Sequence, residues 1–171
     1  MIYLLRGRVQ ELAPTYTVVE VAGVGYYVGI SLQTSQRLVL GEETLLYTQQ
    51  IFREDAQLLY GFSSLLEKEI FNLLISVNGV GAVSALILLS SLSLEEIPNA
   101  ILSGNAALLQ KVKGIGAKTA ERIIVDLRDK MQKYAISGEN ISPHSYNKTK
   151  EEALSELPRS EERRVGKECR S

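Results

Sequence analysis

Residues 73–88, LLISVNGVGAVSALIL, and residues 108–123, LLQKVKGIGAKTAERI, are two copies of one motif set 35 residues apart. A repeat of this kind indicates two copies of one supersecondary unit. Each copy predicts a helix, a tight Gly-apolar-Gly turn and a second helix, with the apolar residue tucked between the two helices. Val80/Ile115 is a conservative pair, and the identical pairs are Leu73/Leu108, Leu74/Leu109, Val77/Val112, Gly79/Gly114, Gly81/Gly116, Ala82/Ala117 and Ala85/Ala120.

The chemistry of this turn favours phosphate. Glycine permits unusual φ angles and carries no Cβ to hold a ligand away from the backbone N–H groups. Those groups lie at a helix N-terminus, where unpaired amides and the helix dipole attract an anion. In the second copy Lys118 and Arg122 add charge one turn apart. The alternative is two packed hairpins with glycine in ordinary tight turns. Two turns in register, one of them rich in Lys, favour phosphate contacts that do not read bases.

Charge is distributed unevenly along the chain, whose net charge is −1. Residues 105–134 carry seven Lys/Arg against three Asp/Glu, whereas residues 1–63 carry four against six. A local basic patch can bind phosphates while acidic surface elsewhere limits non-specific binding. Charge alone also fits an ordinary solvated helix face.

The N-terminal part of the chain predicts a small β-barrel. Five Val-, Leu- and Tyr-rich segments are separated by Gly, Pro or charged breaks, at residues 3–9, 16–22, 25–32, 44–52 and 56–62. Residues 23–25, GVG, form a predicted turn that tolerates positive φ, and residues 53–55 a hairpin tip joining the last two strands. An OB-like barrel is the natural interpretation, with a small SH3-like barrel as the alternative.

The pattern changes to helical at Ser63-Ser64, so the predicted fold class is α+β. Ser64 and Glu67 form a predicted capping box, Ser93 and Glu96 a second one, and Asn105 a further N-cap. Pro98 is expected to start or bend a helix. The predicted division is a barrel domain over residues 1–63, a helical domain with tandem hairpins over residues 64–134 and a polar linker over residues 135–150.

Several other functions lack support in the sequence. GIGAKT leaves three residues between Gly114 and Lys118, where a phosphate-binding P-loop needs five. Residues 23–29, GVGYYVG, have one residue too many for a dinucleotide fingerprint. His144 and Cys169, each the only residue of its type, predict neither a triad nor a metal site. We therefore expect no catalytic residue, no metal and no cofactor. No apolar run is long enough to cross a membrane, and we expect a cytoplasmic protein.

Residues 53–62, REDAQLLYGF, residues 77–82, VNGVGA, and residues 112–130, VKGIGAKTAERIIVDLRDK, resemble the Holliday-junction-binding RuvA family. The resemblance covers residues 1 to about 157. It implies a non-catalytic subunit that binds four-way junction DNA as a homotetramer in DNA recombination and repair. It also implies a C-terminal domain that binds the hexameric ATPase RuvB, which drives branch migration, and a link to the RuvC resolvase. The residues expected to grip duplex phosphates are Gly79, Val80, Gly81, Gly114, Ile115, Gly116, Lys118, Thr119 and Arg122.

The resemblance also gives a role to Glu54 and Asp55, which look like the acidic pin of the family. Four such pairs near a tetramer centre would repel phosphates at the crossover and favour strand separation. Without the resemblance this pair is an ordinary polar hairpin tip.

Two departures from the family pattern limit what carries over. The first hairpin has Ala82-Val83-Ser84 after Gly81, with no Lys, so we expect its contact to rest mainly on backbone amides and to contribute a small share of the affinity. Residues 151–158 look like the start of a truncated RuvB-binding domain, for which we expect no RuvB contact. Residues 159–171, RSEERRVGKECRS, resemble a translated sequencing adapter and are expected to be non-native.

Two alternative functions remain open from the sequence. A helix-hairpin-helix DNA glycosylase uses a similar turn, but it needs a catalytic Asp well downstream and no Asp follows Asp129. A general OB-plus-hairpin module would bind single strands by stacking bases on exposed aromatic rings. Tyr26, Tyr27 and Tyr47 could serve, although as strand residues they are expected to pack in the barrel.

Overall fold

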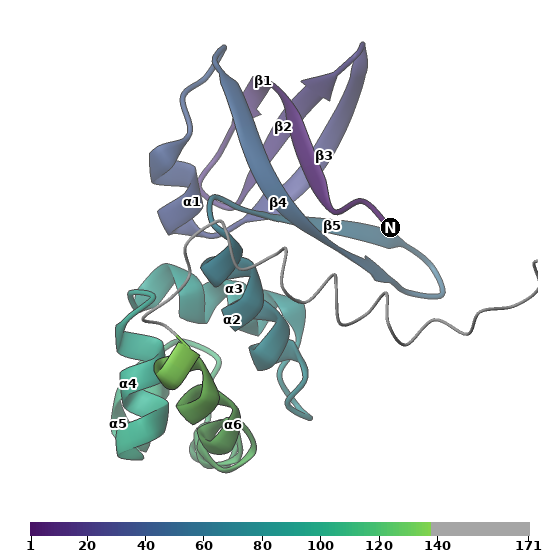
Figure 1. Cartoon of the computed structure of the whole chain (residues 1–171). Coiled ribbons are helices and arrows are strands. Elements are labelled where there is room, and N and C mark those ends of the chain that lie inside the picture. Colours follow the sequence, from purple (N-terminus) through teal and green to yellow (C-terminus); the bar gives the residue numbers. More distant parts are fainter. Residues whose placement is uncertain (138–171) are drawn as a thin grey trace, which may run out of the picture. The chain divides into compact units, whose positions relative to one another are not determined.

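We analysed a computed structural model of the chain, which describes residues 1–137 and, within them, the side chains of residues 1–132 (Figure 1). Met1–Gln132 form one compact unit. The predictions for the rest of the linker, for residues 151–158 and 159–171, and for His144 and Cys169 lie outside the described residues. The elements are β1 (Leu4–Leu12), β2 (Tyr16–Val21), β3 (Val24–Ile30), α1 (Leu32–Arg37), β4 (Glu43–Phe52), β5 (Gln57–Phe62), α2 (Leu65–Ile75), α3 (Ala82–Ser91), α4 (Glu96–Ser103), α5 (Ala106–Gln110) and α6 (Ala117–Ser137).

The five predicted strands form a closed barrel in the order β1-β2-β3-β5-β4, with α1 between β3 and β4 (Figure 1). Paired strands are antiparallel except β3 and β5, which run parallel at Gly29–Tyr60 and Ile30–Gly61. Val28 and Ile30, two residues apart on β3, point into the same buried core. The order of strands and the helix after β3 confirm the OB-like barrel.

The two hairpin turns of the barrel follow the sequence signals, with one correction. Val21 pairs with Val24, so the β2–β3 turn consists of Ala22 and Gly23, with φ angles of 51° and 83°. Positive φ at both positions is the pattern of a type I′ turn, which matches the twist of the flanking strands. Gly25, predicted as part of this turn, is instead a strand residue. The predicted tip at residues 53–55 joins β4 to β5, and there the Arg53 N–H donates to the Ala56 carbonyl at 2.8 Å.

The helical signals predict most of the helix starts. Ser93 and Glu96 form a complete capping box, with bonds of 2.7 Å from the Ser93 N–H and 3.1 Å from the Glu96 N–H. The Asn105 side chain accepts the Leu108 N–H at 3.1 Å. Pro98 lies in the first turn of α4, where its missing N–H costs no helical bond. The last helix, α6, continues to Ser137, beyond the predicted start of the linker at residue 135.

A single apolar core runs from the last barrel strand through the helices. Phe62 on β5 is fully buried, and its ring centroid lies 4.8 Å from that of Phe71 on α2. Tyr60 also packs on Phe71, at 5.3 Å. The strand-to-helix change falls between Phe62 and Leu65. The division into domains at residues 63 and 64 stays a prediction, because Met1–Gln132 form one unit.

A buried carboxylate joins the barrel to the helices. Glu67 is 1% exposed, and its side chain accepts hydrogen bonds from the Ser31 hydroxyl, from the Thr34 hydroxyl at 2.7 Å and from Ser63. The Ser63 bonds come from its N–H at 3.3 Å and its hydroxyl at 3.2 Å. The predicted capping box is therefore half right: Ser64 accepts the Glu67 N–H at 3.2 Å. Glu67 does not bond back to Ser64, because donors on α1 surround its carboxylate.

The end of α3 forms the second part of this joint. The Leu32 N–H donates to the Ser90 hydroxyl at 2.9 Å, and the Gln33 side chain donates to the Leu92 carbonyl at 2.6 Å. The short helix α1 thus contacts the start of α2 and the end of α3. These bonds fix the first hairpin relative to the barrel.

Lys68, the residue after Glu67, is buried without a hydrogen bond. Its ammonium has no hydrogen-bond partner among the described residues and lies 3.6 Å from the centroid of the Tyr3 ring. Desolvation lowers the pKa of Lys68 from its ordinary value of 10.5, against an opposing effect of Glu69. The unfolded chain binds this proton more tightly, so the contribution of Lys68 to stability increases as the pH rises from the lowered pKa towards 10.5.

We predict that Glu67→Gln lowers the free energy of unfolding by about 1 to 3 kcal/mol, because an amide leaves part of this buried donor set unpaired. Urea denaturation measures the change. Glu42→Gln in the turn before β4 is the control, since Glu42 is exposed and such a substitution changes stability by less than about 0.5 kcal/mol. Equal effects of the two substitutions would show that the joint is not held by this carboxylate.

Candidate functional site

The two repeats fold into hairpins with the same backbone geometry. In the first, the Val80 N–H donates to the Val77 carbonyl at 3.0 Å; in the second, Ile115 donates to Val112 at 3.1 Å. Val80 and Ile115 are each 5% exposed. The predicted helix, turn and helix are therefore confirmed in both copies, with the apolar residue of each turn buried.

The first glycine of each turn is required by the backbone. Gly79 has a φ of 92° and Gly114 a φ of 89°. This is the left-handed region, in which a Cβ costs about 1 to 2 kcal/mol. The turn thus reverses the chain within a few residues, so that the second helix of each hairpin starts at the molecular surface.

The second glycine of each turn is not required by the fold. A Cβ built on Gly81 or on Gly116 would meet no atom of the described chain within 4 Å, and neither residue has a positive φ. Packing and backbone conformation would therefore accept a larger residue at both positions. An open space next to backbone N–H groups is what close approach by an external ligand needs.

These second glycines also begin the helices that follow. Gly81 is the N-cap of α3, and its carbonyl accepts the Ala85 N–H at 3.0 Å; the Gly116 carbonyl accepts the Ala120 N–H at 2.9 Å. The first amides of a helix have no intrahelical partner, and glycine has no side chain to cap them. Both hairpins thus present N–H groups and the positive end of a helix dipole to solvent.

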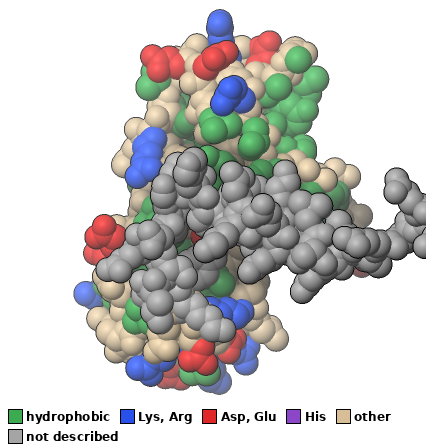
Figure 2. Space-filling view, viewed as in Figure 1, with side chains coloured by type: hydrophobic (Ala, Val, Ile, Leu, Met, Phe, Trp, Pro, Cys, Tyr) green, Lys and Arg blue, Asp and Glu red, His purple; other side chains and the backbone are tan. Residues whose placement is uncertain are grey.

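Positive side chains surround the second turn. Lys113 and Lys118 are exposed and Thr119 is half-exposed. In the first hairpin the residue aligned with Lys118 is Val83, which is 62% exposed. Figure 2 shows Lys and Arg side chains among acidic ones at the end of the molecule where α5 and α6 lie. The positive charge of the site is thus concentrated on the second hairpin.

Arg122 connects the two hairpins, which the sequence did not predict. Its Nη1 donates to the Asn78 carbonyl at 3.2 Å, across 44 residues of chain. The same nitrogen lies 4.0 Å from the position of a Cβ on Gly79. One signal for this contact was available: Arg122 aligns with Ile87, so the repeat differs here in chemical type.

The predicted acidic pin lies on a different element from the hairpins. Glu54 and Asp55 are exposed at the β4–β5 tip. This exposed position of Glu54 and Asp55 fits a charged pair that faces solvent or a ligand.

The tyrosines of the barrel correct one expectation. Tyr27 does not pack in the barrel: it is 64% exposed and stacks on Tyr16 with ring centroids 4.8 Å apart. Tyr26 and Tyr47 are half-buried. The Tyr16 hydroxyl donates to Glu11 at 2.5 Å, and this hydrogen bond and the charge of Glu11 raise the pKa of Tyr16. An adjacent carboxylate repels phosphate, so this aromatic pair is poorly placed to bind a single strand.

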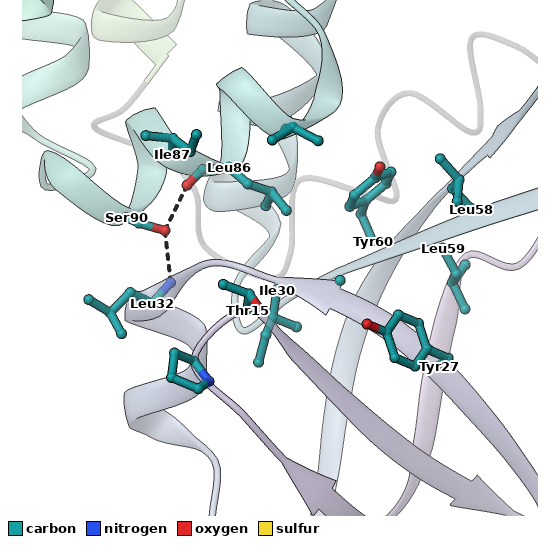
Figure 3. A pocket seen from close by; sticks show the side chains of 13 residues that line it. Thr15, Tyr27, Ile30, Leu32, Leu58, Leu59, Tyr60, Leu86, Ile87 and Ser90 are labelled. Atoms are coloured by element: carbon teal, nitrogen blue, oxygen red, sulfur yellow. Dashed lines mark hydrogen bonds between the residues drawn. The ribbon is translucent and has the colours of Figure 1, made fainter. Parts of the chain in front are cut away.

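An apolar groove of about 470 Å³ lies between the barrel and α3 (Figure 3). Its walls include Tyr27 and Leu32 from the barrel side and Leu86 and Ile87 from α3. No Asp, Glu or His is among the described residues that line it. The groove therefore offers apolar contact area rather than acid-base chemistry, and the catalytic Asp of a glycosylase has no counterpart in it.

Within residues 1–137, no group of three or more His, Cys, Asp or Glu side chains could hold a metal ion. No single helix in this range is long and apolar enough to cross a membrane; α3 and α4 pass that test only as a pair bent by 103°. Several apolar residues of these two helices are buried in the core, among them Leu88, Leu89, Ile97 and Ile101.

Comparisons with known proteins agree with this architecture. Residues 1–61 match the model of the RuvA N-terminal domain, and residues 71–129 match that of the SAM-like helix-hairpin-helix tandem. The fold and the site thus define a protein class in which an OB-like barrel carries two helix-hairpin-helix motifs.

Three curated relatives are named Holliday junction branch migration complex subunit RuvA. The protein of Christiangramia forsetii is 47% identical over 157 residues, which cover 92% of this chain and 81% of that protein. That of Flavobacterium psychrophilum is 46% identical with the same coverage. The protein of Methylobacillus flagellatus is 47% identical over 139 residues, which cover 81% of this chain and 70% of that protein. The chain belongs to the RuvA family.

We predict different effects on stability for substitutions of the two glycines of the first turn. Gly79→Ala should lower the free energy of unfolding by about 1 kcal/mol or more, because alanine is strained at positive φ. Gly81→Ser should leave stability unchanged or raise it by a few tenths of a kcal/mol, because serine is a good N-cap. Thermal and urea denaturation of both variants test this, and a loss of stability in Gly81→Ser would mean that the fold itself requires this glycine.

Proposed function

We propose that this protein binds four-way junction DNA by its phosphate backbone, without reading base sequence and without a catalytic site of its own. The observation that carries the proposal is the pair of uncapped helix N-termini at Gly81 and Gly116, each beside space that a Cβ could fill. The residues proposed to contact phosphate are those of the two turns, with Lys118, Thr119 and Arg122.

The names of the relatives support the larger setting. A branch migration complex needs a motor, and residues 1–137 contain no P-loop. We propose that the RuvB ATPase supplies branch migration and that the RuvC resolvase acts on the same junction. Contact with RuvB is not expected of residues 151–158 alone. A cytoplasmic location follows from the DNA substrate.

We also propose that the protein works as a homotetramer, with the acidic pin at its centre. A closed ring needs two different complementary surfaces on each subunit. The groove beside α3 is one candidate. The other is the exposed apolar set at the N-terminus and the start of α2, formed by Met1, Tyr3, Leu4, Leu65 and Leu66. In such a ring Glu54 and Asp55 would repel phosphates at the crossover and favour strand separation.

A gel-shift titration tests the DNA proposal. A four-way junction, a linear duplex and a single strand of equal length are compared at two salt concentrations. We expect tight, salt-sensitive binding of the junction. Lys118→Ala should weaken it by about tenfold and reduce the salt dependence, because a phosphate contact is lost. Lys130→Ala, the same charge change three turns further along α6, is the control.

Two results would contradict the proposal. Equal binding of all three DNAs would mean that the protein is a general DNA-binding module without preference for junctions. Preference for the single strand would point instead to the stacked Tyr16–Tyr27 pair as the binding surface.

The assembly is tested by one substitution in the groove. Leu32→Glu should disrupt self-association, because it places a charge in an apolar interface. Leu32 is 40% exposed, and an acid at the first position of α1 favours the helix, so the subunit should still fold. Analytical ultracentrifugation gives the oligomeric state. Leu40→Glu, on an exposed residue outside the groove, should leave it unchanged; dissociation by both variants or by neither would contradict the assignment of the groove.

A further inference from the structure

Arg122 belongs to the second hairpin by sequence and contacts the first hairpin in space. It lies near the start of α6, and its guanidinium donates to the carbonyl of Asn78, the residue before Gly79. The contact therefore joins the two turns at the point where each presents its backbone N–H groups.

The exposed position of this hydrogen bond indicates that it orients the two turns relative to each other rather than stabilising the fold. Arg122 and Asn78 are both exposed, and water could satisfy the Asn78 carbonyl equally well. A single exposed hydrogen bond contributes little to folding, because water bonds to the same groups in the unfolded chain. Its effect is instead to restrict the distance between two turns that belong to separate hairpins.

The chemistry of arginine suits this task. A guanidinium carries five N–H donors in a rigid planar fork, so one donor can hold a carbonyl while the others remain available for a phosphate. A lysine ammonium has the same charge but no such fork. The first copy of the repeat has Ile87 at the aligned position, so only the second hairpin supplies this link.

We propose that Arg122 is a positioning residue that holds the two turns as one phosphate-binding unit on a single duplex arm. This inference rests on the proposed function. The first hairpin has no Lys after Gly81 and attracts phosphate through its N–H groups alone. Such neutral donors bind well only when they are already aligned with the ligand, and the Arg122–Asn78 bond supplies that alignment.

A double-mutant cycle tests the proposal. Ser84 is half-exposed in the first turn of α3 and aligns with Thr119. Ser84→Glu favours the helix, since an acid there complements the dipole, while its charge repels phosphate from the first hairpin. Arg122→Lys keeps the charge and loses the fork. Lys118→Ala, the matched control, loses charge and keeps the Arg122–Asn78 bond.

The readout is the dissociation constant for a four-way junction, measured with the full chain at two salt concentrations. Ser84→Glu should weaken binding about tenfold in the wild-type and Lys118→Ala backgrounds, and less than about twofold in the Arg122→Lys background, because coupled sites are not additive. Arg122→Lys alone should weaken binding about tenfold with an unchanged salt dependence, because the number of charges is the same.

Two results would overturn the proposal in different ways. A full tenfold effect of Ser84→Glu in the Arg122→Lys background would show that the two hairpins bind independently, while junction binding itself stands. Failure of the wild-type chain to bind any junction would overturn the proposed function and this inference together. Circular dichroism of each variant confirms that it is folded.

Discussion

Glu67 carries the constraint on which the rest of the structure depends. A buried carboxylate is tolerated only when donors surround it, and here Ser31, Thr34 and Ser63, which all precede α2, provide them. Two of these donors belong to the N-terminal part of α1 and one to the residue after β5. Breaking such a set costs far more than breaking an exposed contact, because each donor is left unpaired in a buried site. These bonds therefore hold the barrel and the first hairpin together within one compact unit.

This joint matters because the candidate site lies at the opposite end of the same helices. The carboxylate sits on the first turn of α2, and the chain leaves α2 directly into the Gly79–Gly81 turn. The direction of α2 therefore sets where the first turn points relative to the barrel and the β4–β5 tip. The contacts of Leu32 and Gln33 with the end of α3 do the same for the returning helix. A surface that must match a large, rigid ligand benefits from such fixed spacing.

The features set by short stretches of sequence were predictable. Alternating apolar residues gave the five strands, and the repeat gave both hairpins with their buried Val80 and Ile115. The features that sequence missed depend on contacts between distant residues. Nothing near Glu67 in the chain shows that donors on α1 surround its carboxylate. The repeat differs in chemical type at Arg122, but it does not show that Asn78 lies beside this residue. Tyr27 fits a barrel interior by type, but its register with β2 turns it outward onto Tyr16.

The two copies of the repeat differ in how freely their surface residues could be substituted. In the first copy, α3 begins at the Gly79–Gly81 turn, and its side, through Val83, Leu86 and Ile87, forms a wall of the groove. In the second copy, Lys118 and Arg122 occupy the positions aligned with Val83 and Ile87. Under the proposed function the two copies have different tasks: the first would contact both protein and DNA, and the second DNA alone. Substitutions on α3 would then be limited twice, once by the turn at its start and once by the groove along its side.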